Sequence, residues 1–505
     1  MTDPIEPGGD AFARDESFPE QDAPEPAVKR QVTARGAALA GARVVAGLVG
    51  VGVAVVTIGA AGLLPFPVIR SAPPSVLVTP VPTAQQLVCP GAVLRLADET
   101  GEGATTASAI GQPVVDYEAS AGPVDATAFA QSDAATESTP QAPTLISTPP
   151  SDSGDAEPPL LSGAQVQAVG EGEFAGLVAA DCAVASGDAW LVGGSTAVGR
   201  TTLLTLSNPT EVPATVDLEL YGENGLIAAP GTSGIIVAPR GQRVLSLAGF
   251  RPDIVSPAVH VTSRGGLVVA NLQQSVVRGL VPGGLDIVGS APTASLENVI
   301  PGVLVADPLA VQAMQGGGPA FEDVRTVLRL FAPGESDAGA TVRVIPESGT
   351  ETGTSFELDL EAGRVLDVPL DDLAAGSYTV RVESSEPLVA AVRVTAAAGE
   401  TSDFAWAVAA PALPDRAQVT VADGPAPRLH LSNPTSAEVA VEVGDVLVVV
   451  PADGSAVVAV EAGATYRLAG FERLFAAVSF ADGGFLAQYA VHPPGVASGA
   501  ITIYP

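Results

Sequence analysis

The sequence predicts an all-β ectodomain, built from tandem immunoglobulin-like β-sandwiches behind one N-terminal transmembrane helix. Three observations predict this fold. A charge-free apolar stretch lies near the N-terminus, short runs rich in Val, Leu and Thr recur between Gly, Pro, Asn and Asp, and one strand motif is repeated. A single β-propeller formed by the whole ectodomain is the alternative that these observations leave open.

The first segment, residues 1–43, is predicted to be a disordered cytoplasmic tail. Its first part is acidic and rich in proline, a composition that buries too little apolar surface to support a core. Basic residues then lead into the apolar stretch: Lys29, Arg30, Arg35 and Arg43. Only Arg70 follows the stretch closely. Because basic residues stay on the cytoplasmic side, this asymmetry predicts a cytoplasmic N-terminus and an extracytoplasmic bulk.

The apolar stretch itself, Val44–Phe66, is predicted to be a transmembrane helix. Its 23 residues carry no charge. At about 1.5 Å per residue they form a helix of roughly 34 Å, enough for a hydrocarbon core of about 30 Å. A cleaved signal peptide is the alternative, although its apolar region is shorter and ends in small residues. The lipid bilayer is therefore an expected partner, and the expected location is the cell membrane with a single pass.

The charge of the chain argues against nucleic acid as a partner. The 505 residues carry a formal net charge of −33 at pH 7, and no cluster of Lys and Arg occurs beyond the membrane flank. Such clusters are needed to neutralise phosphates. We interpret the acidic surface as a feature that keeps an exported protein soluble.

Two cysteines, Cys89 and Cys182, both follow the predicted helix and are expected outside the membrane. Disulfides persist in oxidising compartments, so we predict a bridge between them. Two unrelated buried thiols are the alternative. A metal site is not expected at either cysteine, since the chain has no CxxC motif and only three histidines.

Three β-sandwich domains are predicted, over residues 73–300, 301–412 and 413–505. The first is expected to contain a disordered acidic insertion at about residues 98–160, which hold eleven Asp or Glu and neither Lys nor Arg. A short strand inside this insertion, near Gln112–Tyr117, is left open.

An internal repeat supports the division into similar domains. The segment Leu204–Thr210 (LTLSNPT) returns as Leu429–Thr435 (LHLSNPT), and Leu247–Phe250 (LAGF) returns as Leu468–Phe471. A weaker third copy begins at Leu328. Two matches at similar spacing indicate duplication of one fold unit. The segments that link the copies also resemble each other: Asp286–Pro292 (DIVGSAP) and Asp403–Pro411 (DFAWAVAAP).

Each strong copy contains an Asn-Pro pair, Asn208-Pro209 in the first and Asn433-Pro434 in the last. An Asn side chain can cap a turn, Pro fixes the next φ angle, and Pro cannot donate to a sheet ladder. Each pair is therefore predicted to end a strand. In the middle copy, Tyr378 lies in the run GSYTVRV, which is typical of the tyrosine corner of immunoglobulin-like sandwiches.

The sequence contains no catalytic motif that we can identify. The nucleophile elbow GxSxG, the zinc motif HExxH and the Walker phosphate loop are all absent. His260, His430 and His492 each lie in an apparent strand, where we interpret them as structural or solvent-facing. Trp190 and Trp406 are predicted to fill the cores, and a sugar-stacking contact at either is the alternative. We therefore predict no enzyme activity, no cofactor and no metal site.

Four segments of the chain carry a combination of motifs: CPGAVLRL, DCAVASGDAWLVGG, LTLSNPT and ATVDLELYGENG. They contain Cys89, Cys182, Trp190–Gly194 and Asn208-Pro209. Over roughly residues 40–505 the chain resembles an uncharacterised, actinobacterial-type family of single-span, membrane-anchored β-rich proteins. The family has no established activity, so the resemblance carries over no functional residue. It implies a role in the cell envelope, near the assembly of surface glycans.

The sequence therefore predicts a membrane-anchored extracytoplasmic envelope protein, whose β-sandwich repeats act as a non-catalytic scaffold or binding module. An envelope protein or glycan is the expected partner. The alternative is a cell-wall carbohydrate-binding or carbohydrate-active protein, with Trp190, Trp406 or an acidic cleft as its site.

Overall fold

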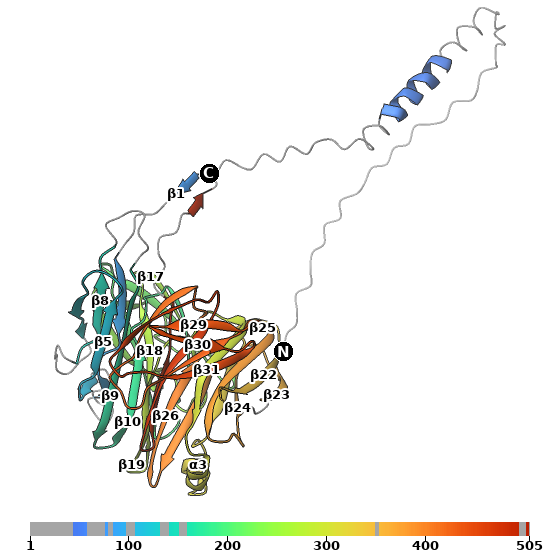
Figure 1. The fold of residues 1–505 in the computed structure, drawn as a ribbon. Helices are drawn as coiled ribbons and strands as arrows, with labels where there is room; N and C mark the ends of the chain where they lie inside the picture. The colour runs from blue at the N-terminus through green and yellow to red at the C-terminus, as the bar shows by residue number, and fades with distance from the viewer. Residues whose placement is uncertain are drawn as a thin grey trace, which may run out of the picture. The chain divides into compact units, whose positions relative to one another are not determined.

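The predicted all-β fold is confirmed. The computed structural model describes residues 44–57, 76–78, 84–96, 107–131, 141–150, 159–348, 353–493 and 501–503. These belong to two units: residues 1–76 with 503–505, and residues 77–502. In the second unit nearly all regular structure is β-strand, as Figure 1 shows. Short strands β1 (Val76–Val78) and β35 (Ile501–Ile503) pair only with each other.

In the first unit, residues 44–57 form a helix. They are the first part of the predicted span Val44–Phe66, and the rest of that span lies outside the described residues, as does the predicted tail 1–43. Every Val and Leu of this helix is exposed, from 59% at Val53 to 70% at Val56. Among the residues that the structure describes, no helix combines the length and the apolar character needed to cross a membrane.

The second unit contains four sets of strands, which we call modules N, 1, 2 and 3 in chain order. Modules 1, 2 and 3 each have eight strand positions. We number the strand positions of each module from 1 to 8 in chain order. In one sheet of each module the neighbouring strands then have the order 1-6-3-4, and in the other sheet they have the order 5-2-7-8. The same order in all three modules is the structural counterpart of the sequence repeat.

Module 1 comprises β11 (Asp188–Val192), β12 (Arg200–Asn208), β13 (Ala214–Gly222), β14 (Gly225–Ile227) and β15 (Ile235–Val237) at position 4, β16 (Gly241–Ser246), α2 (Leu247–Phe250), β17 (Ala258–Gly265), β18 (Val269–Arg278) and β19 (Val281–Val288). Module 2 comprises β20 (Ser295–Val305), α3 (Pro308–Gln315), η1 (Pro319–Phe321), β21 (Val327–Phe331), β22 (Ala338–Pro346), β23 (Thr354–Leu360), β24 (Val365–Pro369), β25 (Gly376–Ala398), whose two halves fill positions 6 and 7, and β26 (Thr401–Val408). Module 3 comprises β27 (Arg416–Thr420), β28 (Arg428–Asn433), β29 (Val439–Val443), β30 (Val446–Val450), β31 (Gly454–Ala459), β32 (Thr465–Ala469), β33 (Phe475–Asp482) and β34 (Phe485–Ala490).

Module N lies before these three, and its described residues fill six of the eight positions. Its sheet β2-β8-β6 corresponds to 1-6-3, and its sheet β5-β9-β10 corresponds to 2-7-8. The predicted domain 73–300 therefore holds two strand sets, modules N and 1. The strands are β2 (Gln85–Cys89), β3 (Val93–Leu96), β4 (Ala107–Ile110), β5 (Val114–Ala119), β6 (Asp125–Ala128), β7 (Ala130–Gln131), β8 (Thr144–Thr148), β9 (Leu161–Glu171) and β10 (Phe174–Asp181).

Module N corrects the prediction of a disordered acidic insertion at about residues 98–160. Strands β4 to β8 lie within that range, and β5 covers most of the strand left open near Gln112–Tyr117. The acidic composition suggested disorder because it offers few apolar side chains. These strands nevertheless find backbone partners: β4 pairs with β3, β5 with β9, β8 with β2 and β6, and β7 with β16 of module 1. The correction concerns residues 107–131 and 141–150, and most other residues of the insertion lie outside the described ones.

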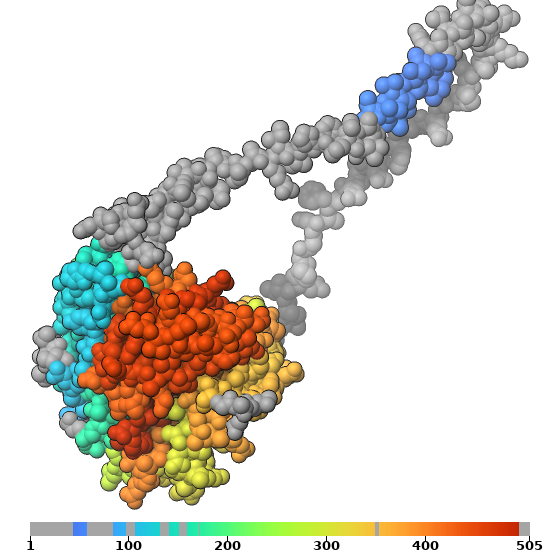
Figure 2. Space-filling model, in the orientation of Figure 1, coloured from blue at the N-terminus to red at the C-terminus, as the bar shows by residue number. Residues whose placement is uncertain are grey.

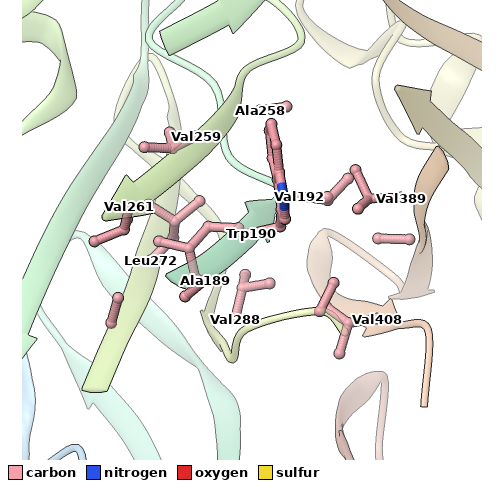
Figure 3. Close-up of a cluster of buried hydrophobic side chains, with 14 of the residues drawn as sticks. Ala189, Trp190, Val192, Ala258, Val259, Val261, Leu272, Val288, Val389 and Val408 are labelled. Carbon is pink, nitrogen blue, oxygen red and sulfur yellow. The ribbon is translucent and has the colours of Figure 1, made fainter. Parts of the chain in front are cut away.

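Burial differs between the two kinds of sheet. In the 1-6-3-4 sheets it alternates along a strand, as in β13 and β22, because one face is packed and the other is solvated. In the 5-2-7-8 sheets it is nearly continuous, as in β12, β18 and β26. These sheets are therefore covered on both faces, by their own module and by the preceding one. Figure 3 shows such a contact, with Trp190 and Val192 of module 1 near Val389 and Val408 of module 2.

The four modules close into a ring. Their strands at position 8 lie side by side in the order β10, β19, β26 and β34, and β34 in turn lies beside β10. In Figure 2, module 3 (orange-red) lies between module N (cyan) and module 2 (yellow to light orange). At the seam between the last and first modules, the hydroxyl groups of Ser162 and Thr420 are 2.7 Å apart, and Gln418 donates to the carbonyl of Glu118.

One buried carboxylate connects all four strands of this ring. Asp403 belongs to β26, and its Oδ2 accepts hydrogen bonds from the backbone N–H groups of Leu177 in β10 (2.9 Å) and Leu486 in β34 (3.3 Å). Its Oδ1 accepts a third from Leu285 in β19 (3.2 Å). Complete burial raises the pKa of Asp403 well above its ordinary value, and the amide donors oppose part of that rise.

Two glycines make room for the Asp403 carboxylate. A Cβ atom added at Gly176 would lie 2.8 Å from Oδ1, and one added at Gly284 would lie 2.6 Å from it. Gly284 also has φ of +104°, a conformation that other residues avoid. The backbones of β10 and β19 can approach this carboxylate only because these positions lack a side chain.

The Asn-Pro pairs end strands, as their sequence predicts. Strand β12 ends at Asn208 and β28 ends at Asn433. Oδ1 of Asn208 accepts from the N–H of Thr210 (2.9 Å), and its Nδ2 donates to the carbonyl of Val212 (2.8 Å). Asn433 makes the same contacts with the residues two and four positions ahead of it. Pro209 and Pro434 follow as the turn begins.

Tyr378 makes the contact of a tyrosine corner. It lies near the start of β25, at position 6 of module 2, and its hydroxyl donates to the backbone carbonyl of Ala374 at 2.8 Å. This bond holds the turn between positions 5 and 6 against the sheet.

The predicted disulfide between Cys89 and Cys182 is confirmed. Cys89 ends β2 and Cys182 directly follows β10, so the bridge ties the two sheets of module N together. Both residues are buried, within a small apolar cluster that includes Leu87, Ile146 and Leu161.

Replacing both cysteines, C89A/C182A, should lower the free energy of unfolding by about 2–5 kcal/mol, because the bridge restricts a long loop of the unfolded chain. Denaturant titration of the full chain measures this. Reductant should bring the wild type to the stability of the variant and leave the variant unchanged. A reduced wild type that keeps its full stability would contradict the prediction.

Candidate arginine cleft

A polar cleft of about 390 Å³ lies between modules 1 and 2. We call it the arginine cleft. Charged residues from both modules line it together with a tryptophan: Arg200 from module 1, and Asp323, Arg325, Arg329, Asp367, Arg393 and Trp406 from module 2. Its module 1 residues come from β12, β18 and neighbouring loops, and its module 2 residues come from η1 and the segment that follows it and from β21, β24, β25 and β26.

Three arginines converge on one carboxylate at this cleft. Asp323 follows the short helix η1, and Nη2 of Arg200, at the start of β12, lies 2.8 Å from its Oδ1. Nη2 of Arg278, at the end of β18, lies 2.9 Å from the same oxygen. Arg393, in the second half of β25, lies farther away, with both Nη atoms 3.5 Å from Oδ2. The cluster therefore holds two more positive than negative charges.

This excess of positive charge changes how its members ionise. Burial disfavours the charged form of Asp323, but the three guanidinium groups outweigh it and lower the pKa of that carboxyl to about 2. Burial lowers the pKa of Arg393 to about 10; Asp323 opposes this effect, whereas the neighbouring guanidinium groups add to it. At neutral pH Asp323 and Arg393 are therefore both charged.

Arg329 forms a second, neutral pair in the cleft. It lies directly opposite Asp367 in the β21–β24 ladder and donates to both carboxylate oxygens, at 2.8 and 2.9 Å. Its Nη1 donates to the carbonyl of Gly194 at 2.9 Å, and its guanidinium group lies 4.6 Å from the centre of the Trp406 ring. Burial raises the pKa of Asp367, but the charge of Arg329 outweighs it and holds the pKa below its ordinary value.

Neither tryptophan offers an open face for a sugar. Trp190 is 6% exposed, and its ring stacks on that of His260 with centroids 4.2 Å apart. Trp406 is 3% exposed and its Nε1 donates to Gln274 at 2.7 Å. A Cβ added at Gly193 would lie 3.3 Å from the Trp406 ring. Both tryptophans fill cores, and only Trp406 reaches the cleft.

Two glycines of the sequence motif Trp190–Gly194 place its backbone at the cleft. Gly193 lies against the Trp406 ring, and the carbonyl of Gly194 accepts a hydrogen bond from the guanidinium group of Arg329. Gly194 has φ of +86°, which favours glycine at this point.

A second polar group resembles a catalytic triad but is fully buried. Nε2 of His430 lies 2.7 Å from the hydroxyl of Ser479, and its Nδ1 lies 2.5 Å from Oε2 of Glu347. These residues are 0%, 2% and 4% exposed, respectively. Since a substrate could not reach the hydroxyl, we interpret the group as a polar connection between modules 2 and 3.

Asp286 lies behind the cleft, in β19. Its Oδ2 accepts a hydrogen bond from the backbone N–H of Trp406 at 2.7 Å, and its Oδ1 has no partner among the described residues. Complete burial raises the pKa of Asp286 to about 8, although the amide bonds oppose the rise. Within the part of the chain that the structure describes, no three His, Cys, Asp or Glu side chains are placed to hold a metal ion.

Residues 133–469 match the model of a family of unknown function, DUF5719. The chain belongs to this family. In the DUF5719 chain the match begins between β7 and β8 and ends with β32, so it includes the arginine cleft and Asp403. Comparison of the chain with curated proteins and with solved structures found no significant match.

Sequence reasoning did not find the arginines of this DUF5719 cleft. One signal was present: Arg329 and Arg393 interrupt otherwise apolar strands, VLRLF and LVAAVRVTAAA. A charge inside a doubly buried strand needs a partner. The echo between the segments at Asp286 and Asp403 was a second signal, because both begin with an Asp that the structure buries completely.

The substitution D286N should remove part of the pH dependence of stability. The folded carboxyl holds its proton up to about pH 8, whereas the unfolded one loses it near pH 4. Wild-type stability should therefore fall as the pH rises from about 4 to about 8, by up to about 1.4 kcal/mol per unit. Asn keeps an oxygen for the Trp406 amide and carries no charge.

Thermal unfolding of both proteins from pH 5 to pH 9 measures this effect. The variant should become the more stable protein as the pH approaches 9. The matched control is D445N, at an exposed turn between β29 and β30. Equal pH profiles for the wild type and D286N would contradict the prediction.

Proposed function

We propose that this chain is a membrane-anchored, extracytoplasmic binding protein of the cell envelope, without catalytic activity of its own. The observation that carries the binding role is the arginine cleft, where three guanidinium groups share one carboxylate. The membrane anchor is the charge-free stretch Val44–Phe66, whose described helical residues expose all their large apolar side chains. The Cys89–Cys182 disulfide supports an oxidising location.

We infer that modules 1, 2 and 3 are each an immunoglobulin-like sandwich. In immunoglobulin domains strand 2 pairs with strand 5 in one sheet and strand 3 pairs with strand 6 in the other. Modules 1, 2 and 3 share both pairings, and the Tyr378 corner lies at the start of position 6, as in those domains. A single propeller, the alternative, shares the ring arrangement but has one sheet per blade.

The absence of catalysis is proposed from the charged groups themselves. A glycosidase needs one carboxylic acid that keeps its proton near neutral pH. The pKa values of Asp323 and Asp367 are both lowered by arginines, so neither can serve as that acid. Asp286 keeps its proton, but it is completely buried and no substrate can reach it. The Ser479–His430–Glu347 group is shielded from any substrate.

Binding of a neutral carbohydrate in the same cleft is the alternative. The location of Trp406 on the cleft wall favours it, since sugars stack on aromatic rings. The guanidinium group of Arg329 lies over that ring and would have to move first.

A tag fused after Pro505 should be cleaved by protease added to intact spheroplasts, because the proposed anchor exports everything that follows it. A tag placed before Met1 is the control and should be protected until the membrane is lysed. Immunoblotting of both tags gives the result. Protection of the C-terminal tag in intact spheroplasts would refute the membrane topology.

A further inference from the structure

We propose that the arginine cleft binds an oxyanion, the carboxylate or phosphate group of an acidic envelope ligand. This inference rests on the proposed binding function and names the chemistry of its ligand. The group that would receive the oxyanion is the guanidinium of Arg393, flanked by that of Arg200.

The first argument is charge. Three guanidinium groups pair with Asp323, and no other carboxylate forms an ion pair with Arg278 or Arg393 among the described residues; the nearby Asp367 is paired with Arg329. Glu322, the remaining acid at the cleft, is exposed to solvent. A chain of net charge −33 thus keeps a local positive excess in a partly enclosed site. An anion is the ligand that such a site attracts.

The second argument is an unused donor. The side chain of Arg393 is 9% exposed, and its Nε has no hydrogen-bond partner within the described structure. Its two Nη atoms reach Asp323 only at 3.5 Å, the limit of hydrogen bonding. Buried donors are normally satisfied. The Nε atom is closed to solvent, so the weakly bonded Nη groups of Arg393 are the donors for an oxygen in the cleft. A guanidinium group fits carboxylate and phosphate oxygens because its N–H groups form a planar fork.

The third argument is how Arg393 is held. It lies directly opposite Trp406 in the β25–β26 ladder, and its guanidinium group lies 4.6 Å from the centre of the Phe404 ring. Burial and the neighbouring guanidinium groups lower the pKa of Arg393 to about 10. A bound anion would raise this pKa again, because it favours the charged guanidinium group. The arginine is thus fixed in place before any ligand arrives, which reduces the entropy lost on binding.

The size of the cleft limits the ligand to a small group. Its volume of about 390 Å³ lies near the lower end of small-molecule sites. The acidic group of a single sugar or a phosphate ester fits this range. The two sources share the same oxyanion chemistry and differ in geometry, so separate probes can distinguish them.

The test uses the full chain in a nonionic detergent at constant ionic strength. The probes are inorganic phosphate and D-glucuronate, with D-glucose as the uncharged match to glucuronate. Midpoints of thermal unfolding and tryptophan fluorescence report binding, since Trp406 lines the cleft. At least one anion should raise the midpoint and change the fluorescence, whereas glucose should do neither. The anion that binds more tightly identifies the source.

Variants assign the binding to the cleft. R393Q should weaken the anion at least tenfold, and R200Q, at the more exposed rim, provides the same test if R393Q does not fold. The matched control R264Q removes an arginine that is 76% exposed and far from these residues in the sequence; it should bind as the wild type does. D323N removes the competing carboxylate, so anions should stabilise it more than they stabilise the wild type.

The proposal is overturned if neither anion has an effect beyond that of sodium chloride, or if R264Q and R393Q lose binding equally. Equal effects of glucose and glucuronate would also overturn it and would favour the neutral-carbohydrate alternative. None of these outcomes depends on membrane topology, which the tag experiment tests separately. Failure of this inference can therefore be told apart from failure of the proposed anchor.

Discussion

The carboxylate of Asp403 is the contact on which the arrangement of the modules depends. It accepts backbone hydrogen bonds from β10, β19 and β34 while belonging to β26, so each of the four modules contributes one strand to it. Burying a carboxylate is costly unless its oxygens are bonded. If module N, 1 or 3 moved away, the Asp403 carboxylate would lose one of its backbone N–H donors. The shared hydrogen bonds therefore hold the four strands at fixed distances from one another.

The arginine cleft follows from the same packing. Strand β26 carries Asp403 at the ring centre and, three residues later, Trp406 at the cleft. Asp286 of β19 binds the Trp406 backbone, so the neighbouring ring strand also fixes the cleft wall. The arginines come from strands with both faces buried, where a charge persists only beside a partner or a ligand. The positions of these arginines are therefore set by core strands, whereas Asp323 reaches them from the segment that follows η1.

Much of the local structure could be predicted from the sequence. The strand-rich pattern, the Cys89–Cys182 bridge, and the strand ends at Asn208 and Asn433 depend on short-range chemistry that is visible in the residues. Module N, the ring and the arginine cleft could not be predicted. They depend on which sheets meet in space: Arg278 and Arg393 reach Asp323 from different modules, and the acidic β5 pairs with a strand more than 40 residues later.

The closed ring has an evolutionary consequence. In an open solenoid each repeat touches only its neighbours, so repeats can be gained or lost at little cost. Here the last module packs back on the first, through Ser162, Thr420 and Gln418. Adding or deleting one module would change the angle at every junction and leave two sheet faces bare. Once the ring is closed, a further duplication no longer yields a packed structure. Later changes are therefore confined to the side chains of each module, while the number of modules stays the same.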